Sequence, residues 1–268
     1  MADWEKAKRF QNRKSKMEMK KMIEWGILGI LLCAVFAMTL MRTPAEISTM
    51  LTDITAQLRT YALIVHGLFL AMIAGGLAFK KIRNTLFFLF IAFLSLSATI
   101  VSIVYAILPN ILIFAMFFIL IVNAYRRKEL NFDLENARPV TLFFGTLGLI
   151  FGFWYLHWVA DPLLLNALLY SPVGVINCPT MLTVIAFLIL TVKPRSTILE
   201  FAVGSVTLYF GFFGLFRLDA YVDVALIACA LFLLMRIGAS IPRGAFFSGQ
   251  VPAEQKTNIR RQKQKREF

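Results

Sequence analysis

The chain has 268 residues, of which 59% are hydrophobic and 26 are Phe. A soluble domain of this length cannot bury so much apolar surface in one core, so the composition excludes a soluble globular protein. The net charge is +13, and the distribution of the basic residues between apolar runs is typical of a membrane protein and does not favour nucleic-acid binding.

The apolar runs predict an all-α fold, a polytopic transmembrane helix bundle of about eight spans. Each run is close to the roughly 20 residues that a helix needs to cross a hydrocarbon layer about 30 Å thick. The spans are expected at 22–41, 60–79, 85–107, 110–125, 140–160, 174–192, 197–216 and 219–237. Because the fourth run is short, a six-span alternative stays open, in which residues 85–125 form a re-entrant pair.

The basic residues predict the orientation of this bundle. All but three of the 28 Lys and Arg lie in the two tails and in alternate gaps between the spans. Cytoplasmic loops carry such an excess, so both termini are expected in the cytoplasm and the protein in the plasma membrane. The exceptions, on the outer side, are Arg42, Arg59 and Arg217. The bilayer itself is therefore an expected partner, with anionic lipid at the cytoplasmic face.

Three parts of the chain follow from this pattern. Residues 1–21 form a basic cytoplasmic segment, residues 22–238 the eight-span domain, and residues 239–268 a basic and disordered cytoplasmic tail. A long basic head precedes the first apolar run and no cleavage site follows it, so the first span is interpreted as a signal anchor. The three cysteines never pair at C-x-x-C spacing, which favours neither disulfides nor zinc, and no cofactor motif is present.

The first outer loop contains a helix start. Thr43 as N-cap, Pro44 at the first helical position and Glu46 at the third together form a capping box. Apolar residues then recur on one helical face. The pattern predicts an amphipathic helix over residues 44–59 that lies on the outer surface of the membrane.

Other local signals lie later in the chain. A second capping box is predicted at Thr197 and Glu200, where the seventh span begins. A short outer helix is expected over 161–170, after an Asp-Pro start. Gly148 and Gly152 are four residues apart in the fifth span and indicate close packing against another helix.

The sixth span opens with the polar sequence Asn177-Cys178-Pro179-Thr180. Pro179 removes a backbone donor, while Asn177 and Thr180 place polar groups just inside the outer leaflet. Broken helices with such polar groups hold solute sites in transporters. In the simpler alternative, Pro179 only starts a short helix and residues 171–178 are irregular.

The same region resembles a family of uncharacterised prokaryotic multi-pass integral membrane proteins. The resemblance rests on Tyr170, Pro172, Gly174 and Cys178-Pro179-Thr180, and a similar pattern covers about residues 43–238. The chain departs from the family in having Met181 where a second Thr is usual and in lacking a His just before Tyr170. The resemblance implies the multi-span architecture and a role for the Cys-Pro-Thr motif, and it implies no reaction.

His66 and Asp223 are the remaining candidates, because a polar side chain inside a span is costly and often functional. We expect a small-solute or ion permease in which His66, Asn177, Cys178 and Thr180 line the site. Asp223 would bind a proton or a cation. No catalytic motif and no cluster of metal ligands appears in the sequence.

Two other classes of function stay open. A scaffold or accessory subunit of a larger membrane complex, or a homo-oligomer, would suit a chain with few charges inside its spans. An enzyme acting on lipid is less favoured, and it would need an acid or a His near the headgroups, such as Glu200 or His157.

Overall fold

The computed structural model describes residues 25–155, 157, 158 and 169–240. The chain divides into two compact units, Met1–Leu234 and Met235–Phe268, and the following concerns the first. The basic N-terminal segment, most of the predicted outer helix at 161–170 and most of the C-terminal tail lie outside the described residues.

The described residues are helical apart from turns, loops and one isolated bridge, which confirms the predicted all-α class. The helices are Trp25–Thr39, α2 (Pro44–Gln57), α3 (Arg59–Ala78), α4 (Arg83–Val104), α5 (Leu108–Arg126), α6 (Pro139–Phe153), α8 (Asn177–Ile189), α9 (Thr197–Arg217), the 3-10 turn η1 (Tyr221–Asp223) and α10 (Val224–Ser240).

Within this part of the chain, five helical segments are long and apolar enough to cross a membrane. They are α3, α4, α5, α9 and the segment Tyr221–Ala239. Trp25–Thr39 and α2 count as a sixth when taken together, although they bend by 98° at the break between them. The helices α6 and α8 are apolar but have only 15 and 13 residues. Each predicted span thus overlaps an apolar helix, but only five segments, or six with the bent pair, are long and apolar enough to cross a membrane.

Residues 85–125, for which a re-entrant pair was the alternative, lie in the two helices α4 and α5 and the turn between them. The helices α4 and α5 have 22 and 19 residues, and each is long enough to cross a membrane. The turn between them precedes Pro109, which lies in the first turn of α5. A proline fits there because the first turn of a helix does not use its N–H groups.

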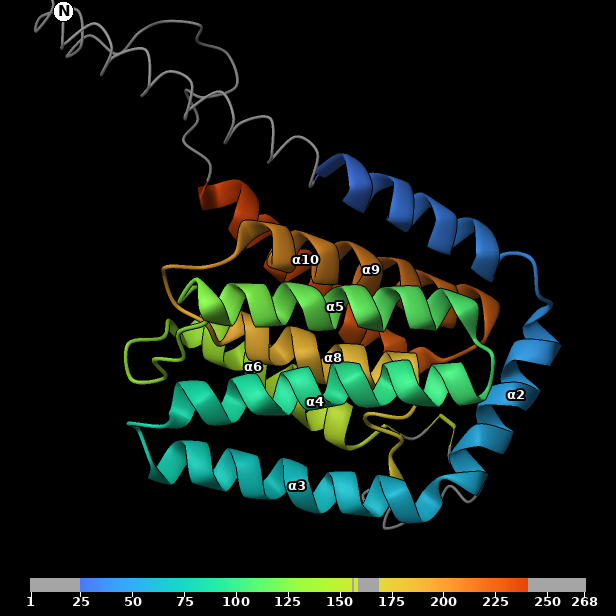
Figure 1. The fold of residues 1–268 in the computed structure, drawn as a ribbon, viewed down its shortest axis with the longest axis horizontal. Helices are drawn as coiled ribbons and strands as arrows, with labels where there is room; N and C mark the ends of the chain where they lie inside the picture. The colour runs from blue at the N-terminus through green and yellow to red at the C-terminus, as the bar shows by residue number, and fades with distance from the viewer. Residues whose placement is uncertain (1–24, 156, 159–168, 241–268) are drawn as a thin grey trace, which may run out of the picture. The chain divides into compact units, whose positions relative to one another are not determined.

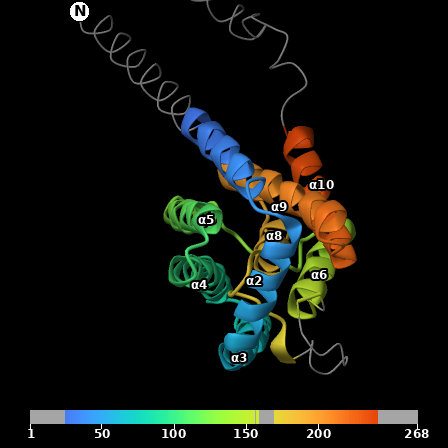
Figure 2. The same ribbon diagram turned by 90° about the vertical axis from the view of Figure 1, so that its right-hand side faces the viewer.

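The helix α8 forms the centre of the unit. All 13 of its residues are buried, and so are residues 171–176 before it. The helices α4, α6 and α9 pack against α8 (Figure 2). Near its end, the Phe187 ring lies 5.0 Å from that of Phe87 and 5.7 Å from that of Phe90. A helix with no face toward lipid need not match the thickness of the bilayer.

The glycines of α6 allow its close approach to α8. A Cβ at Gly152 would lie 2.4 Å from Thr183 Oγ1 and 3.3 Å from the Pro179 carbonyl oxygen. A Cβ at Gly148 would lie 2.8 Å from the Ala186 Cβ. The close helix contact predicted at this pair of glycines is therefore confirmed.

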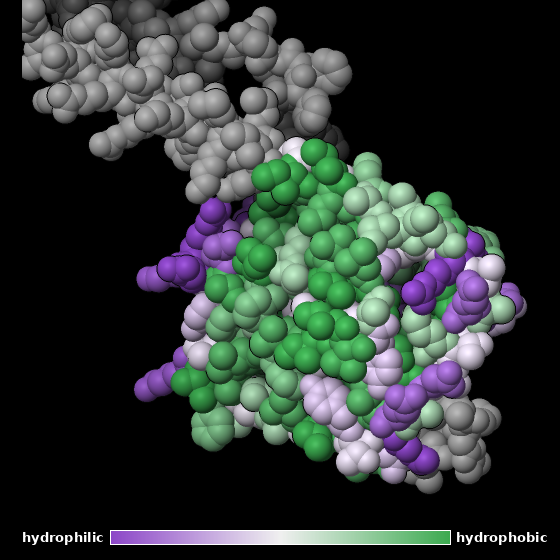
Figure 3. Space-filling view, turned by 45° about the vertical axis from the view of Figure 1, so that its right-hand side comes forward, coloured by the Kyte–Doolittle hydropathy of each residue, from purple (hydrophilic) through white to green (hydrophobic). Residues whose placement is uncertain are grey.

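The outward faces of the helices are apolar. Ile64, Phe143 and Phe216 are 64%, 61% and 75% exposed, and they belong to three different helices. Figure 3 shows apolar side chains joined into one broad surface. Exposed apolar area of this extent would be unfavourable in water and suits a surface that faces lipid.

The helix α2 begins as predicted, and its apolar face is buried. The Thr43 N–H donates to Glu46 Oε2 at 2.9 Å and the Glu46 N–H to Thr43 Oγ1 at 3.4 Å, so the capping box is present. Leu51 and Ile54 on the apolar face are buried in the core. This face therefore packs on the other helices of the unit.

The capping box predicted at Thr197 and Glu200 is wrong. The N-cap of α9 is Ser196, and no side chain caps the helix start. The buried Glu200 carboxylate instead lies 3.6 Å from Arg195 Nε. The attraction of a nearby guanidinium explains why this acid leaves the helix start uncapped.

The connections divide between two ends of the unit. Residues 79–82, 127–138 and 190–196 lie together at one end, on the left in Figure 1, and we call this the basic end. The helix α2, the α4–α5 turn and the α9–η1 turn lie at the opposite end. This separation is the one expected from the alternation of basic gaps along the sequence.

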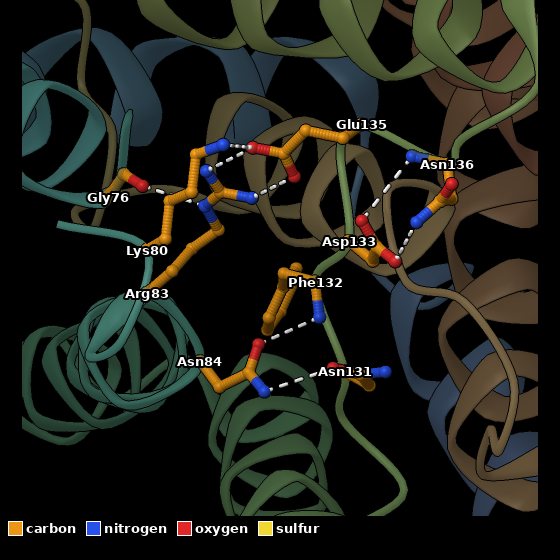
Figure 4. A network of polar contacts seen from close by, with 9 residues as sticks. All are labelled: Gly76, Lys80, Arg83, Asn84, Asn131, Phe132, Asp133, Glu135 and Asn136. Carbon is orange, nitrogen blue, oxygen red and sulfur yellow. Dashed lines mark hydrogen bonds and ion pairs between the residues drawn. The ribbon is translucent and has the colours of Figure 1, made fainter. Parts of the chain in front are cut away.

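A buried guanidinium holds the basic end together (Figure 4). Arg83, which is 4% exposed, donates from Nε to the Gly76 carbonyl at 2.7 Å and from both Nη atoms to Glu135 at 2.8 and 3.0 Å. Lys80 Nζ lies 3.0 Å from the same carboxylate. A buried charge requires such partners, because it has lost its hydration.

A second set of hydrogen bonds fixes the same connection. Asn84 on α4 donates from Nδ2 to Asn131 Oδ1 at 3.0 Å, and its Oδ1 accepts from the Phe132 N–H at 2.8 Å (Figure 4). The Val192 N–H donates to the Asn131 carbonyl at 2.8 Å. The long connection between α5 and α6 is thus tied both to α4 and to the segment after α8.

Gly152→Ala is expected to destabilise the protein by about 1–3 kcal/mol, because the added methyl group overpacks the contact with α8. Gly67→Ala is the matched control, since nothing lies within 4 Å of a Cβ at that position. The thermal unfolding midpoint in detergent should fall for Gly152→Ala and stay the same or rise for Gly67→Ala. Equal midpoints for the two variants would contradict the close approach of α6 to α8.

Glu135 gives a pH dependence of defined sign. The hydrogen bonds from Arg83 and Lys80 hold the pKa of Glu135 well below its usual range. A lowered pKa stabilises the folded state above the unfolded-state pKa of about 4.3, and this contribution is lost as the pH falls below that value. The thermal unfolding midpoint of the wild type should exceed that of Glu135→Gln by a constant amount between about pH 7 and pH 5. The difference should become smaller at lower pH.

Glu129→Gln provides the control, because Glu129 forms no ion pair within 4 Å among the described residues. A difference between wild type and Glu135→Gln that stays constant to about pH 3 would show that the ion pair does not stabilise the fold.

Candidate functional site

A cavity of about 220 Å³ lies at the end opposite the basic end. It is formed by the end of the Trp25–Thr39 helix, α2, the start of α5, the start of α8 and the end of α9. The exposed Arg42 lies at its mouth, while Asn177 and Cys178, 7% and 3% exposed, lie at its floor. Two of the predicted site residues therefore share one cavity.

Asn177 has an unused hydrogen-bond acceptor. Its Oδ1 is buried and accepts no hydrogen bond from any described residue. Leaving a buried acceptor unpaired costs about 1–3 kcal/mol. Because Asn177 lines the cavity, a molecule bound there can supply the donor.

Asp223 lies behind Cys178 and is fully buried. The Tyr155 hydroxyl donates to Oδ1 at 2.5 Å, and the Cys178 thiol donates to Oδ2 at 3.4 Å. The carboxyl group contacts α9 at Gly214, where a Cβ would collide with it. No Lys or Arg of the described residues forms an ion pair with Asp223. The described residues thus offer the carboxyl group two neutral donors and no ion pair.

His66 does not line the cavity. Its Nδ1 lies 2.9 Å from the Ala62 carbonyl oxygen and its Nε2 lies 2.9 Å from that of Phe153. The ring therefore joins α3 to the end of α6. This corrects the prediction that His66 shares a site with Asn177, because Asn177 lines the cavity and His66 does not.

Thr180 is occupied by the backbone before α8. Its hydroxyl accepts from the Gly174 N–H at 2.8 Å and donates to the Ile176 carbonyl at 2.5 Å. Gly174 has a φ of +74°, a conformation that glycine adopts without strain. Thr180 therefore shapes the loop that leads into the site and does not face the cavity, contrary to its predicted role.

Pro179 does not break the sixth span. The helix α8 begins at Asn177, two residues earlier, so Pro179 lies in its first turn. The irregular stretch is residues 171–176. Proline is tolerated at this position because its missing N–H would have no partner within the helix.

Several residues of the site could not be predicted from the sequence. Tyr155 lies among aromatic residues typical of a membrane interface, yet it is fully buried and bonded to Asp223. Met38, Met50 and Phe213 line the cavity, but such residues occur throughout the apolar spans. Only their contacts in three dimensions distinguish them.

The fold and the site define an α-helical protein whose long helices suit a membrane, with a cavity lined by Cys178, whose thiol contacts a buried carboxyl group. Within the described residues, no cluster of three His, Cys, Asp or Glu could hold a metal ion. Comparison with known protein families, with curated proteins and with solved structures finds no match for the chain. Its function is therefore inferred from the site.

Tyr155→Phe is expected to destabilise the protein by about 1–3 kcal/mol, because it leaves a buried carboxyl oxygen without its donor. Tyr105→Phe is the control, since it removes a hydrogen bond of 2.8 Å to Gln57 at an exposed position. The thermal midpoint should fall clearly for Tyr155→Phe and little for Tyr105→Phe. A similar small change in both would show that Asp223 does not depend on Tyr155.

Proposed function

We propose that the chain is a multi-pass protein of the plasma membrane and that it acts as a permease for a small solute. The proposal places eight membrane segments in the bilayer: the five long segments, the Trp25–Thr39 helix, α6 and α8. Both termini lie in the cytoplasm. The gathering of basic connections at one end supports this orientation, because Lys and Arg favour the cytoplasmic side.

One observation carries the proposed transport function: Asn177 and Cys178 line the cavity, and the Cys178 thiol contacts Asp223. A solute that reaches the cavity floor changes the surroundings of the carboxyl group through this one side chain. Carboxyl groups inside membrane segments serve as proton carriers in transporters. Solute binding and proton binding are therefore coupled in the proposed mechanism.

The position of the cavity suits one state of an alternating-access cycle, the state in which the site is open to one side of the membrane only. The cavity lies at the end with few basic residues, and the fully buried α8 lies between it and the basic end. In the proposed orientation this is the state open to the outside. Transport then requires a second state in which the helices around α8 shift and the site opens to the cytoplasm.

An accessory subunit of a larger membrane complex is the alternative role, and purification from the native host distinguishes the two. The permease predicts a particle without a partner that retains a small molecule in native mass spectrometry. A partner protein in fixed ratio, whose removal destabilises this chain, would favour the accessory role.

Asp223→Asn is expected to reduce solute-dependent proton flux about tenfold or more, because an amide cannot carry the proton. The measurement uses proteoliposomes with a trapped pH-sensitive dye and a panel of small carboxylic acids, alcohols and amines. Asp53→Asn, at an exposed acid of α2, should leave the flux unchanged. Undiminished flux in a well-folded Asp223→Asn variant would contradict proton coupling through this residue.

A further inference from the structure

Positive charge is concentrated at the mouth of the cavity, although this end of the unit has few basic residues. Only Arg42, Arg59 and Arg217 lie outside the basic tails and gaps of the sequence. Two of these meet, because Arg217 Nη2 donates to the Arg42 carbonyl at 3.0 Å. Arg42 lines the cavity, and the Arg217 guanidinium lies 5.4 Å from the centre of the Phe213 ring, which lines it too.

These two guanidinium groups have no ion pair among the described residues. Arg42 Nη1 donates instead to the Met50 sulfur at 3.2 Å. The acid closest to Arg42 along the chain is Glu46, whose Oε2 accepts the Thr43 N–H of the capping box. A bound anion would therefore find charged donors at the mouth that no ion pair occupies.

Beyond its mouth, the cavity is lined mainly by apolar side chains. Its walls include Met38, Met50, Phe210 and Phe213, which offer apolar contact to a chain. A small inorganic anion would leave these apolar walls in contact with water. A neutral apolar molecule would leave the arginines without an anionic partner. A ligand that satisfies both regions has an anionic head and an apolar chain.

We infer that the cavity binds a single-chain anionic amphiphile, with its carboxylate or phosphate at Arg42 and Arg217 and its chain against the apolar walls. A volume of about 220 Å³ suits one short chain better than the two chains of a phospholipid. The inference rests on the proposed function, because it names the class of solute that the permease would carry.

The test measures binding of labelled decanoate to the full-length protein in nanodiscs of phosphatidylcholine, which has no net charge. Arg42→Gln and Arg217→Gln should each raise the dissociation constant about tenfold or more, since each removes a charged donor. Arg59→Gln is the matched control on the same side, because Arg59 lies over the Tyr170 ring and not at the cavity. It should leave the constant unchanged.

Decanol, a neutral molecule of equal chain length, distinguishes the contribution of the charge to binding from that of the chain. It should bind more weakly than decanoate and should not respond to Arg42→Gln, whereas Met38→Trp should block both by filling the cavity. Equal binding of decanol and decanoate would overturn the anionic class and leave the proposed permease intact. Displacement of decanoate by phosphatidylglycerol in the nanodisc would overturn the single-chain assignment.

The binding result is also separable from transport. Decanoate binding that depends on Arg42 and Arg217, together with normal proton flux in Asp223→Asn, would support the ligand class while contradicting proton coupling. Absence of decanoate binding to a folded wild-type protein would overturn the inference itself.

Discussion

The complete burial of α8 is the constraint on which the rest of the unit depends. A helix enclosed on every side must satisfy its polar groups within the protein. Thr180 bonds the loop before α8, and the Thr183 hydroxyl donates to the Pro179 carbonyl at 2.9 Å. The glycines of α6 let α6 lie directly against it. These contacts fix where α8 begins, and that start places Asn177 at the cavity floor and Cys178 against Asp223.

The features that sequence could predict are those set by neighbouring residues. Apolar runs gave the helices, and the capping box at Thr43 formed because its donors and acceptors lie within one turn. The similar pattern at Thr197 failed because the carboxylate of Glu200 lies beside Arg195, a pairing that outweighs the helix start. His66 was assigned to the wrong surroundings since one of its partners belongs to Phe153, 87 positions away along the chain.

The candidate site also depends on contacts between residues that are far apart along the chain. Asn177, Cys178 and Asp223 stood out because polar residues are rare in apolar spans. Their arrangement could not be predicted, because the contact between Cys178 and Asp223 joins two helical segments 45 positions apart. Tyr155 could not be told from an aromatic residue at a membrane interface. Its role depends on the close packing at Gly214, which leaves room for the carboxyl group it binds.

The two ends of the unit differ in how firmly they are held, and this bears on the proposed transport cycle. At the basic end, Arg83 is buried with three hydrogen bonds to two partners. Separating this guanidinium from Glu135 would leave a buried charge without its carboxylate partner. At the opposite end, Arg42 and Arg217 form no ion pair within 4 Å among the described residues. In the proposed permease, opening the basic end would therefore break more charged contacts than opening the end that holds the cavity.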